Sequence, residues 1–300
     1  MATTTTDTPT LHIAIKRYPT NEALLDGKVT SAKLKANFDE VEPIHNAFAP
    51  MAQKQVYDLS EMAVFTYLQA HTYGKPLVLM PVVMASRHQH GCIIFNTEFH
   101  KSITPADLPG KRVGVRAYTQ TTGAWVRNIL MREHGLKLDA VEWICTEGAH
   151  LTEYREPPFV TRAPGRKLID MLRSGEVDAA ILGNDLPDDP RYRPLIPNAK
   201  EAGPAWHKAT GLIPINHMFV ATTKMAVSRP DLVLETYDLL RRAKDVAPTK
   251  GPDMRPIGIE AIRPSLELVI KLAAEQQIIP KAFTVDELFA PWREIERKGA

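Results

Sequence analysis

Hydrophobic and polar residues follow two different patterns along the chain. Residues 11–15 (Leu-His-Ile-Ala-Ile) have the period of a half-buried strand, and residues 77–83 form the continuous apolar run of a fully buried strand. Further strand-like segments lie at residues 56–59, 91–96, 112–115, 140–146, 177–182 and 217–222. Helical spacing predicts helices at residues 43–53, 61–73, 123–134, 166–174, 231–244, 264–276 and 284–298. Because strands alternate with helices, the pattern predicts an α/β fold with mostly parallel sheets.

Short motifs mark where several of these elements end. Gly135 stops the helix at 123–134, and Thr284 with Glu287 has the spacing of a capping box at the start of the last helix. Prolines and aspartates crowd together at residues 185–190. This crowding predicts a loop between residues 183 and 200.

The length of the chain predicts two lobes. At 300 residues it is too long for one ordinary core and suits two lobes of roughly 100–150 residues each. The last three helices have no strands between them, so we expect the chain to return and cover the first lobe. The predicted lobes are residues 1–92 plus 222–300 and residues 93–221. Crossovers are expected near 91–96 and 217–222, where the two lobes would close a cleft on a small ligand.

Composition and charge exclude several classes of protein. Hydrophobic residues make up 44% and charged residues 24%, as in ordinary globular proteins. The formal net charge of +2 and the lack of a block of like charges argue against nucleic acid as a partner. No run approaches the roughly 20 apolar residues that span a bilayer, so no membrane partner is expected.

The two cysteines and the first ten residues indicate in which cellular compartment the protein is expected. Cys92 and Cys145 stand apart in apolar surroundings, which favours buried thiols over a disulfide or a metal knuckle. Residues 1–10 lack the basic and apolar regions of a signal peptide. A cytoplasmic protein is therefore expected.

Seven short stretches carry a resemblance to a known family. They are Tyr57–Met62, Arg87–His90, Leu108–Val115, Thr122–Arg127, Leu172–Ala179, Gly211–His217 and Asp286–Pro291. In this order they resemble the 4,5-dihydroxyphthalate decarboxylase family, cytoplasmic relatives of type II periplasmic binding proteins, over nearly the whole chain. The resemblance implies a two-lobed type II periplasmic-binding-protein-like fold. It also implies decarboxylation of a hydroxylated aromatic di- or monocarboxylate, as in phthalate catabolism.

Two stretches depart from the pattern of that family. The chain has Gln89-His90-Gly91 where family members tend to show Arg-His-Ser, and residues 116–120 lack the expected Pro-Glu pair. The first change removes one cation and one hydroxyl beside His90. Both departures bear on which substrate is bound more than on which fold is formed.

Decarboxylation of a hydroxylated aromatic acid sets the chemistry that the site must supply. A carboxylate has to be held, electrons come from a ring hydroxyl, and a proton has to reach the ring carbon that loses carbon dioxide. A cation and a general acid suffice for this. The sequence shows no nicotinamide fingerprint, phosphate loop or pyridoxal motif, so no organic cofactor is predicted.

Four residues are candidates for binding the carboxylate. Arg87 follows the buried strand at 77–83, and a guanidinium matches a carboxylate with two hydrogen bonds, although a surface ion pair is the alternative. Thr121 and Thr122 stand at a predicted helix N-terminus, where an anion is favoured and where a plain N-cap is the alternative. Arg127, one turn later, reaches the same anion or lies on the solvated face.

Histidines beside the predicted crossovers are the candidate proton donors. Lobe closure would bring His90 and His217 together over the ligand, and a histidine pKa near 6.5 suits acid or base work. A structural role is the alternative for each of them. Tyr18, on the loop after the first strand, is a candidate for stacking on an aromatic ligand.

Glu61 is the remaining catalytic candidate. It follows the strand at 56–59, where strand ends meet a cleft, or it simply opens the next helix as an acidic first-turn residue. No metal is predicted, but His88, His90 and Glu61 together form an alternative site for a divalent metal, because the His-x-His pair shares one side of an extended segment.

Two rival functions stay open beside the lyase. The chain could be a non-catalytic solute-binding protein for an aromatic or dicarboxylic acid, or a ligand-binding module that serves a partner protein. In each case the expected partner is a small aromatic carboxylate. The apolar C-terminal helices leave a homodimer open.

Overall fold

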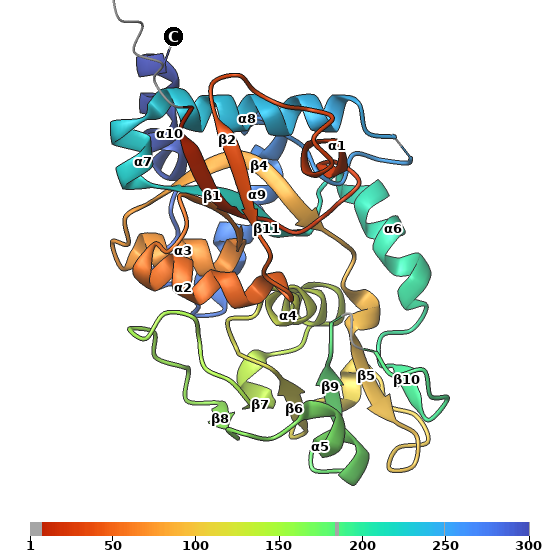
Figure 1. Ribbon diagram of the computed structural model, residues 1–300. Coiled ribbons are helices and arrows are strands. Elements are labelled where there is room, and N and C mark those ends of the chain that lie inside the picture. Colours follow the sequence, from red (N-terminus) through yellow and green to blue (C-terminus); the bar gives the residue numbers. More distant parts are fainter. Residues whose placement is uncertain (1–7, 184–185, 249, 300) are drawn as a thin grey trace, which may run out of the picture. The chain divides into compact units, whose positions relative to one another are not determined.

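The computed structural model describes residues 8–183, 186–248 and 250–299 (Figure 1). Contacts within the chain divide it into two units. Unit 1 consists of Met1–Ala85, His217–Leu266 and Phe283–Ala300, and unit 2 consists of Ser86–Asn216 and Glu267–Ala282. Residues 1–7, on which most of the signal-peptide prediction rests, lie outside the described residues, as does Asp185 of the predicted loop.

Unit 1 is built on a five-stranded mixed sheet. Its strands, in spatial order, are β2 (Lys35–Asp39), β1 (Thr10–Ala14), β3 (Leu59–Ala63), β11 (Ile215–Thr222) and β4 (Leu77–Ser86). Strand β1 is parallel to both β2 and β3, whereas β11 runs antiparallel to β3. All five residues of β3 are buried, as expected for a strand covered on both faces.

Helices surround this sheet. They are α1 (Glu22–Leu25), α2 (Phe48–Lys54), α3 (Val64–Thr72), α7 (Thr223–Ser228), α8 (Pro230–Asp245), α10 (Val285–Gly299) and the first part of α9 (Ile259–Glu275). Helices α2 and α3 pack against β3, and α8 contacts α1, α7 and α10 (Figure 1). The predicted capping box holds at α10, because the Glu287 backbone N–H donates to Thr284 Oγ1 at 3.1 Å.

Unit 2 is built on a six-stranded mixed sheet. Its strands, in spatial order, are β10 (Tyr192–Pro194), β5 (Ile93–Asn96), β9 (Ala179–Ile181), β6 (Arg112–Val115), β7 (Glu142–Cys145) and β8 (Val160–Arg162). Strands β9, β6, β7 and β8 are parallel to their neighbours in that run, while β5 is antiparallel to β9 and β10. The predicted α/β class, with mixed sheets flanked by helices, is confirmed.

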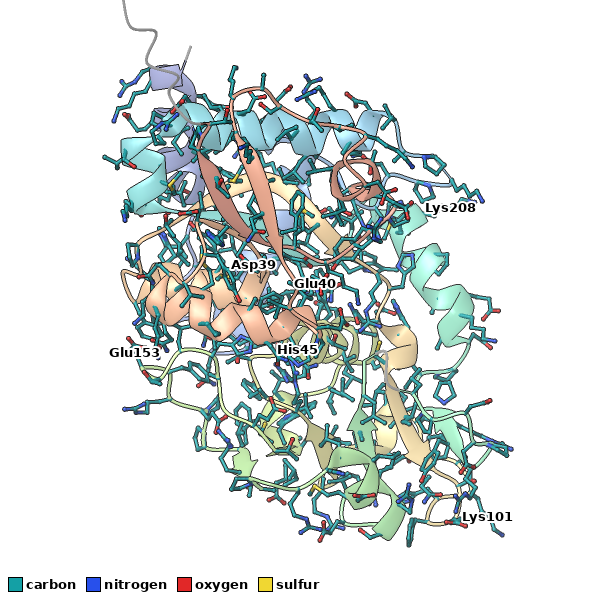
Figure 2. All side chains as sticks on the ribbon, in the orientation of Figure 1. Asp39, Glu40, His45, Lys101, Glu153 and Lys208 are labelled. Carbon is teal, nitrogen blue, oxygen red and sulfur yellow. The ribbon has the colours of Figure 1, made fainter. Side chains whose placement is uncertain are left out.

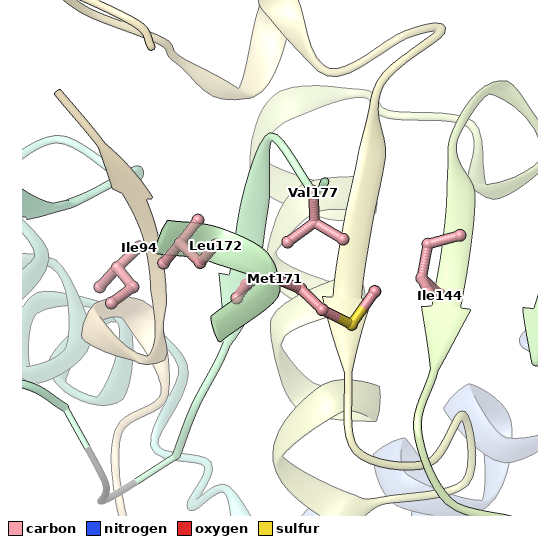
Figure 3. Packing of buried hydrophobic residues seen from close by; sticks show 6 residues of the cluster. Ile94, Ile144, Met171, Leu172 and Val177 are labelled. Carbon is pink, nitrogen blue, oxygen red and sulfur yellow. The ribbon is translucent and has the colours of Figure 1, made fainter. Parts of the chain in front are cut away.

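Unit 2 contains the whole of α4 (Thr121–His134), α5 (Leu168–Ser174) and α6 (Ala199–Thr210), together with the second part of α9. Helix α5 buries Met171 and Leu172 in a cluster with Ile94, Ile144 and Val177 of the sheet side (Figure 3). Helix α6 was not expected from the sequence, because Gly203 and Pro204 interrupt its helical pattern.

The division into units differs from the predicted boundaries (1–92 plus 222–300, and 93–221) chiefly at residues 267–282. These residues were expected in the first lobe, but they make their contacts in unit 2. Gln276, fully buried, accepts a hydrogen bond from Arg127 Nε at 2.8 Å and donates one to the Ala124 carbonyl at 2.8 Å. The periodicity of α9 shows that one face is apolar, but not which sheet that face covers.

Candidate active site

A buried carboxylate lies in the central strand of unit 1. Glu61 is 0% exposed, and β3, which carries it, is flanked by β1 and β11. In the register of β3 and β11, His217 is opposite Ala63, so Glu61 and His217 are diagonal neighbours on one face of the sheet. Glu61 therefore lies inside a strand; the alternative that it opens a helix is wrong, since α3 begins only at Val64.

Three donors converge on the Glu61 carboxylate. Oε1 lies 2.6 Å from His217 Nδ1 and accepts from the Tyr18 hydroxyl at 2.5 Å, while Oε2 accepts from the Lys16 backbone N–H at 3.0 Å. Burial and the charge of Glu61 raise the pKa of Tyr18 far above its usual value, so the phenol stays protonated and donates. The Glu61 side chain thus accepts from Tyr18 and Lys16 and lies within hydrogen-bond distance of His217.

This arrangement fixes the orientation of the His217 ring. An ionised carboxylate can only accept, so with Glu61 ionised the proton between the two residues lies on His217 Nδ1. Phe48 contacts the ring edge to face, with centroids 5.0 Å apart and an interplanar angle of 79°. Within residues 8–183, 186–248 and 250–299, nothing hydrogen-bonds His217 Nε2, and the side chain is 20% exposed. Nε2 is thus the ring nitrogen without a hydrogen-bond partner in the described part of the chain.

Among the described residues, Asp39 at the end of β2, which β1 separates from β3, makes no hydrogen bond or ion pair with this group. Asp39 ends β2 and is followed by Glu40, and both are labelled in Figure 2. Asp39 is paired with His12 at 3.4 Å. Glu61 therefore does not share its site with Asp39.

In unit 2, the predicted anion-binding residues meet at the N-terminus of α4. Arg87 donates from Nη2 to Thr122 Oγ1 at 3.1 Å and from Nη1 to Cys92 Sγ at 3.4 Å. No carboxylate in the described part of the chain lies within ion-pair distance of Arg87, so the surface ion pair expected as the alternative is not formed there. Thr121 is only 5% exposed, and its hydroxyl has no hydrogen-bond partner among the described residues.

Arg127 adds a second unpaired cation near this helix start. Its side chain is fully buried, so the solvated-face alternative is wrong. It donates to Gln276 Oε1 and to the Tyr118 carbonyl, and it stacks 3.9 Å from the centre of the Tyr118 ring. Nη1 has no partner among the residues with described positions, and burial lowers the pKa of the guanidinium. Two guanidinium groups and a helix N-terminus thus favour an anion in this region.

Two curated proteins of known activity are similar to this chain in sequence. The chain is 26% identical over 265 residues to 4,5-dihydroxyphthalate decarboxylase from Comamonas testosteroni, covering 81% of this chain and 77% of that protein. It is 28% identical over 222 residues to 4,5-dihydroxyphthalate decarboxylase from Pseudomonas putida, covering 66% of this chain and 81% of the relative. The resemblance to these decarboxylases is confirmed. No family model matches the chain.

Solved structures confirm the fold. The alkanesulfonate-binding protein SsuA from Xanthomonas axonopodis pv. citri matches with a TM-score of 0.57 and 13% identity, covering 93% of this chain and 97% of SsuA. The desulfurization enzyme DSZB matches with a TM-score of 0.53 and 15% identity, covering 97% of this chain and 100% of DSZB. The type II periplasmic-binding-protein-like fold is therefore shared by a binding protein and an enzyme.

The two histidines of the His-x-His motif have different partners. His90 is 3% exposed and its Nε2 lies 3.2 Å from Glu133 Oε1 in the last turn of α4, about 18 Å along the helix axis from Thr121. His88 faces the ring of His207 on α6, with centroids 6.2 Å apart. The expectation that they share one side is wrong, because a 3-10 helix begins at His90 and ends the period of two.

The alternative metal site divides between the units. His88 and His90 belong to unit 2, whereas Glu61 belongs to unit 1. Among the residues that the structure describes, no group of three histidine, cysteine or acidic side chains is arranged to hold a metal ion. Likewise, no helix in the described ranges is long and apolar enough to cross a membrane.

Sequence reasoning missed how Tyr18 and Phe48 act. Tyr18 was expected to stack on a ligand, but its hydroxyl binds Glu61, and the guanidinium of Arg255 lies 5.1 Å from the centre of its ring. Phe48 belongs to the predicted helix at 43–53, and nothing in the local pattern distinguishes it from a core residue. The register of β3 against β11, which brings these side chains together, is a long-range property of the fold.

Thr121 and Thr122 offer a matched test of the anion site, because each is 5% exposed. We expect Thr121→Val to raise the free energy of unfolding by about 1 kcal/mol, since it removes a buried hydroxyl without a partner. The same variant should weaken carboxylate binding about fivefold or more. Thermal unfolding with and without phthalate measures both effects.

Thr122→Val is the control and should lower the free energy of unfolding by about 1 kcal/mol, because Arg87 loses its acceptor. If Thr121→Val destabilises the protein as much as Thr122→Val does, the Thr121 hydroxyl serves the fold and not a ligand.

Proposed function

We propose that this protein is a decarboxylase, a carbon–carbon lyase, that acts on a hydroxylated aromatic carboxylate such as 4,5-dihydroxyphthalate. The observation that carries the proposal is the Glu61–His217 pair, with Nδ1 held at 2.6 Å and Nε2 free. Sequence similarity to two 4,5-dihydroxyphthalate decarboxylases supports the same chemistry. The match to DSZB shows that this fold can carry an enzyme, which is consistent with a catalytic role.

In this proposal unit 1 supplies the proton. Glu61 stabilises the protonated ring of His217, and the Nε2–H of that ring is donated to the ring carbon bearing the carboxylate that leaves. A hydroxyl on the substrate ring supplies electrons to that carbon. The bond to the carboxylate carbon then breaks, its electron pair restores the aromatic ring, and carbon dioxide departs. Water reprotonates His217 for the next turnover.

Unit 2 supplies the binding of a carboxylate. Arg87 offers paired donors, and the backbone N–H groups at the N-terminus of α4 stand beside the hydroxyls of Thr121 and Thr122. Arg127 is fully buried. Its positive charge would therefore attract the carboxylate without touching it. The proposal uses no organic cofactor and no metal; a divalent metal is the alternative, and it would make turnover sensitive to a chelator.

A non-catalytic binding protein is the second candidate function. The observation that favours it is the match to the alkanesulfonate-binding protein SsuA, the highest TM-score among the structures compared above. Such a protein would bind an aromatic or dicarboxylic acid through the same anion site of unit 2 without releasing carbon dioxide.

Replacing His217 tests the lyase. Incubation of the parent with 4,5-dihydroxyphthalate should release carbon dioxide, and His217→Gln should lower kcat at least about a hundredfold, because the general acid is lost. Ligand-induced thermal stabilisation should persist in that variant. Turnover should also persist after dialysis against a chelator.

His90→Gln is the matched control, since His90 is buried on Glu133. It should keep kcat within about threefold of the parent. Stabilisation of the parent without any carbon dioxide would exclude the enzyme in favour of the binding protein, and a larger loss in His90→Gln than in His217→Gln would reassign the proton donor.

Replacing Arg87 tests the carboxylate contact. We expect Arg87→Gln to raise KM about tenfold or more, because a charge-assisted hydrogen bond to the carboxylate is lost. Arg191→Gln, which alters an exposed arginine paired with Asp189 in the same unit, should leave KM unchanged. Equal KM values for Arg87→Gln and the parent would remove Arg87 from the site.

A further inference from the structure

A third guanidinium without an acidic partner lies in unit 1, against the tyrosine that binds Glu61. Arg255 lies 5.1 Å from the centre of the Tyr18 ring, and its Nε donates to the Met84 carbonyl at 3.0 Å. Within the described ranges, no carboxylate is at ion-pair distance from its side chain. Its two terminal nitrogens are therefore available as a pair of donors.

The acid nearest in sequence is already used. Asp253 accepts from Lys244 Nζ at 2.6 Å through Oδ2 and from the Arg255 backbone N–H at 3.0 Å through Oδ1. Lys244 also donates to the Arg255 carbonyl at 2.7 Å. These bonds fix the backbone at Arg255 and leave its guanidinium unpaired.

The neighbouring strand fixes Arg255 from the other side. The Val83 backbone N–H donates to the Pro256 carbonyl at 3.1 Å, and Val82 forms a bridge with Ile257. Arg255, Met84 and Asn21 line the same small pocket of unit 1. A hydrogen bond at Nε and a cation–π contact on the Tyr18 ring thus hold the guanidinium plane in place before a ligand binds.

Tyr18 connects this guanidinium to the proposed proton donor. Its ring faces Arg255, and its hydroxyl donates to the oxygen of Glu61 that also faces His217. The Tyr18 ring separates the Arg255 guanidinium from the Glu61–His217 pair. A substrate that receives its proton from His217 could therefore place a second, anionic group against Arg255. Arg87, the other candidate, lies in unit 2.

We propose that Arg255 binds a carboxylate of the substrate that is retained during the reaction, and that it makes the protein select aromatic acids with two carboxylates over those with one. The assignment rests on the proposed function for the identity of the substrate class. A guanidinium with two unpaired parallel donors matches a carboxylate in geometry and charge. A monocarboxylic acid lacks the second, retained carboxylate that Arg255 would bind.

Binding of two unreactive probes tests the assignment without any turnover. Phthalate carries two carboxylates and benzoate one, and calorimetry should show that the parent binds phthalate at least about tenfold more tightly. Arg255→Gln should lose about tenfold or more in phthalate affinity, with benzoate affinity changed less than about twofold. The expected result is that the preference for phthalate disappears.

Two control variants make the outcome specific. Arg229→Gln removes an exposed arginine of unit 1 that is paired with Asp231, and it should keep the preference. Tyr18→Phe keeps the ring under Arg255 but removes the hydroxyl on Glu61, so it should keep the preference for phthalate while it lowers turnover.

Three results would overturn the assignment: no preference for phthalate in the parent, an unchanged preference in Arg255→Gln, or an equal loss of affinity for both probes. Failure of the lyase proposal is a separate outcome, because it is measured as carbon dioxide release by the parent. A protein that binds phthalate through Arg255 and releases no carbon dioxide would be a dicarboxylate-binding protein.

Discussion

A carboxylate inside a sheet has to be surrounded by donors, and this requirement organises unit 1. Isolated burial of the Glu61 charge would be very costly, so each neighbouring element supplies a donor. The loop after β1 contributes the Lys16 backbone and the Tyr18 hydroxyl, and β11 contributes the His217 ring. Because these three segments are far apart in sequence, the pair that we assign to proton transfer exists only when the sheet has formed. The site is thus a consequence of the order of the strands.

In the part of the chain that the structure describes, the candidate anion site of unit 2 contains unpaired cations instead of a buried carboxylate. Arg87 and Arg127 both lack an acidic partner among the described residues, and the latter is fully buried. A buried cation is usually paired, because desolvation penalises its charge. Hydrogen bonds to Gln276 and to the Tyr118 carbonyl compensate only part of that penalty for Arg127. An anion bound at the start of α4 would offset more of it, which links the stability of this region to the binding of a ligand.

Local signals in the sequence were enough for the class of fold and for most elements. The apolar run at 77–83 and the capping box at Thr284 are properties of a few adjacent residues, and the structure bears both out. Glu61, His217 and Tyr18 were each chosen because they follow or precede a predicted strand, and they do meet in unit 1. Their mutual contacts could not be predicted, since a shift of the β3–β11 register by one residue would put Glu61 and His217 on opposite faces. The placement of residues 267–282 in unit 2 depends in the same way on a tertiary contact, that of Gln276 with Arg127.

The contacts of Gln89 explain why an uncharged side chain fits at this position, where the family pattern has arginine. Gln89 is 1% exposed, accepts from the Cys92 thiol at 3.3 Å and donates to Asn216 Oδ1 at 2.9 Å. An arginine in this position would add a buried cation to a region where Arg87 and Arg127 already lack acidic partners among the described residues. The amide instead joins Cys92, which Arg87 contacts, to the residue immediately before His217. The sequence change therefore places a neutral amide, hydrogen-bonded to Cys92 and Asn216, where the pattern has a charge.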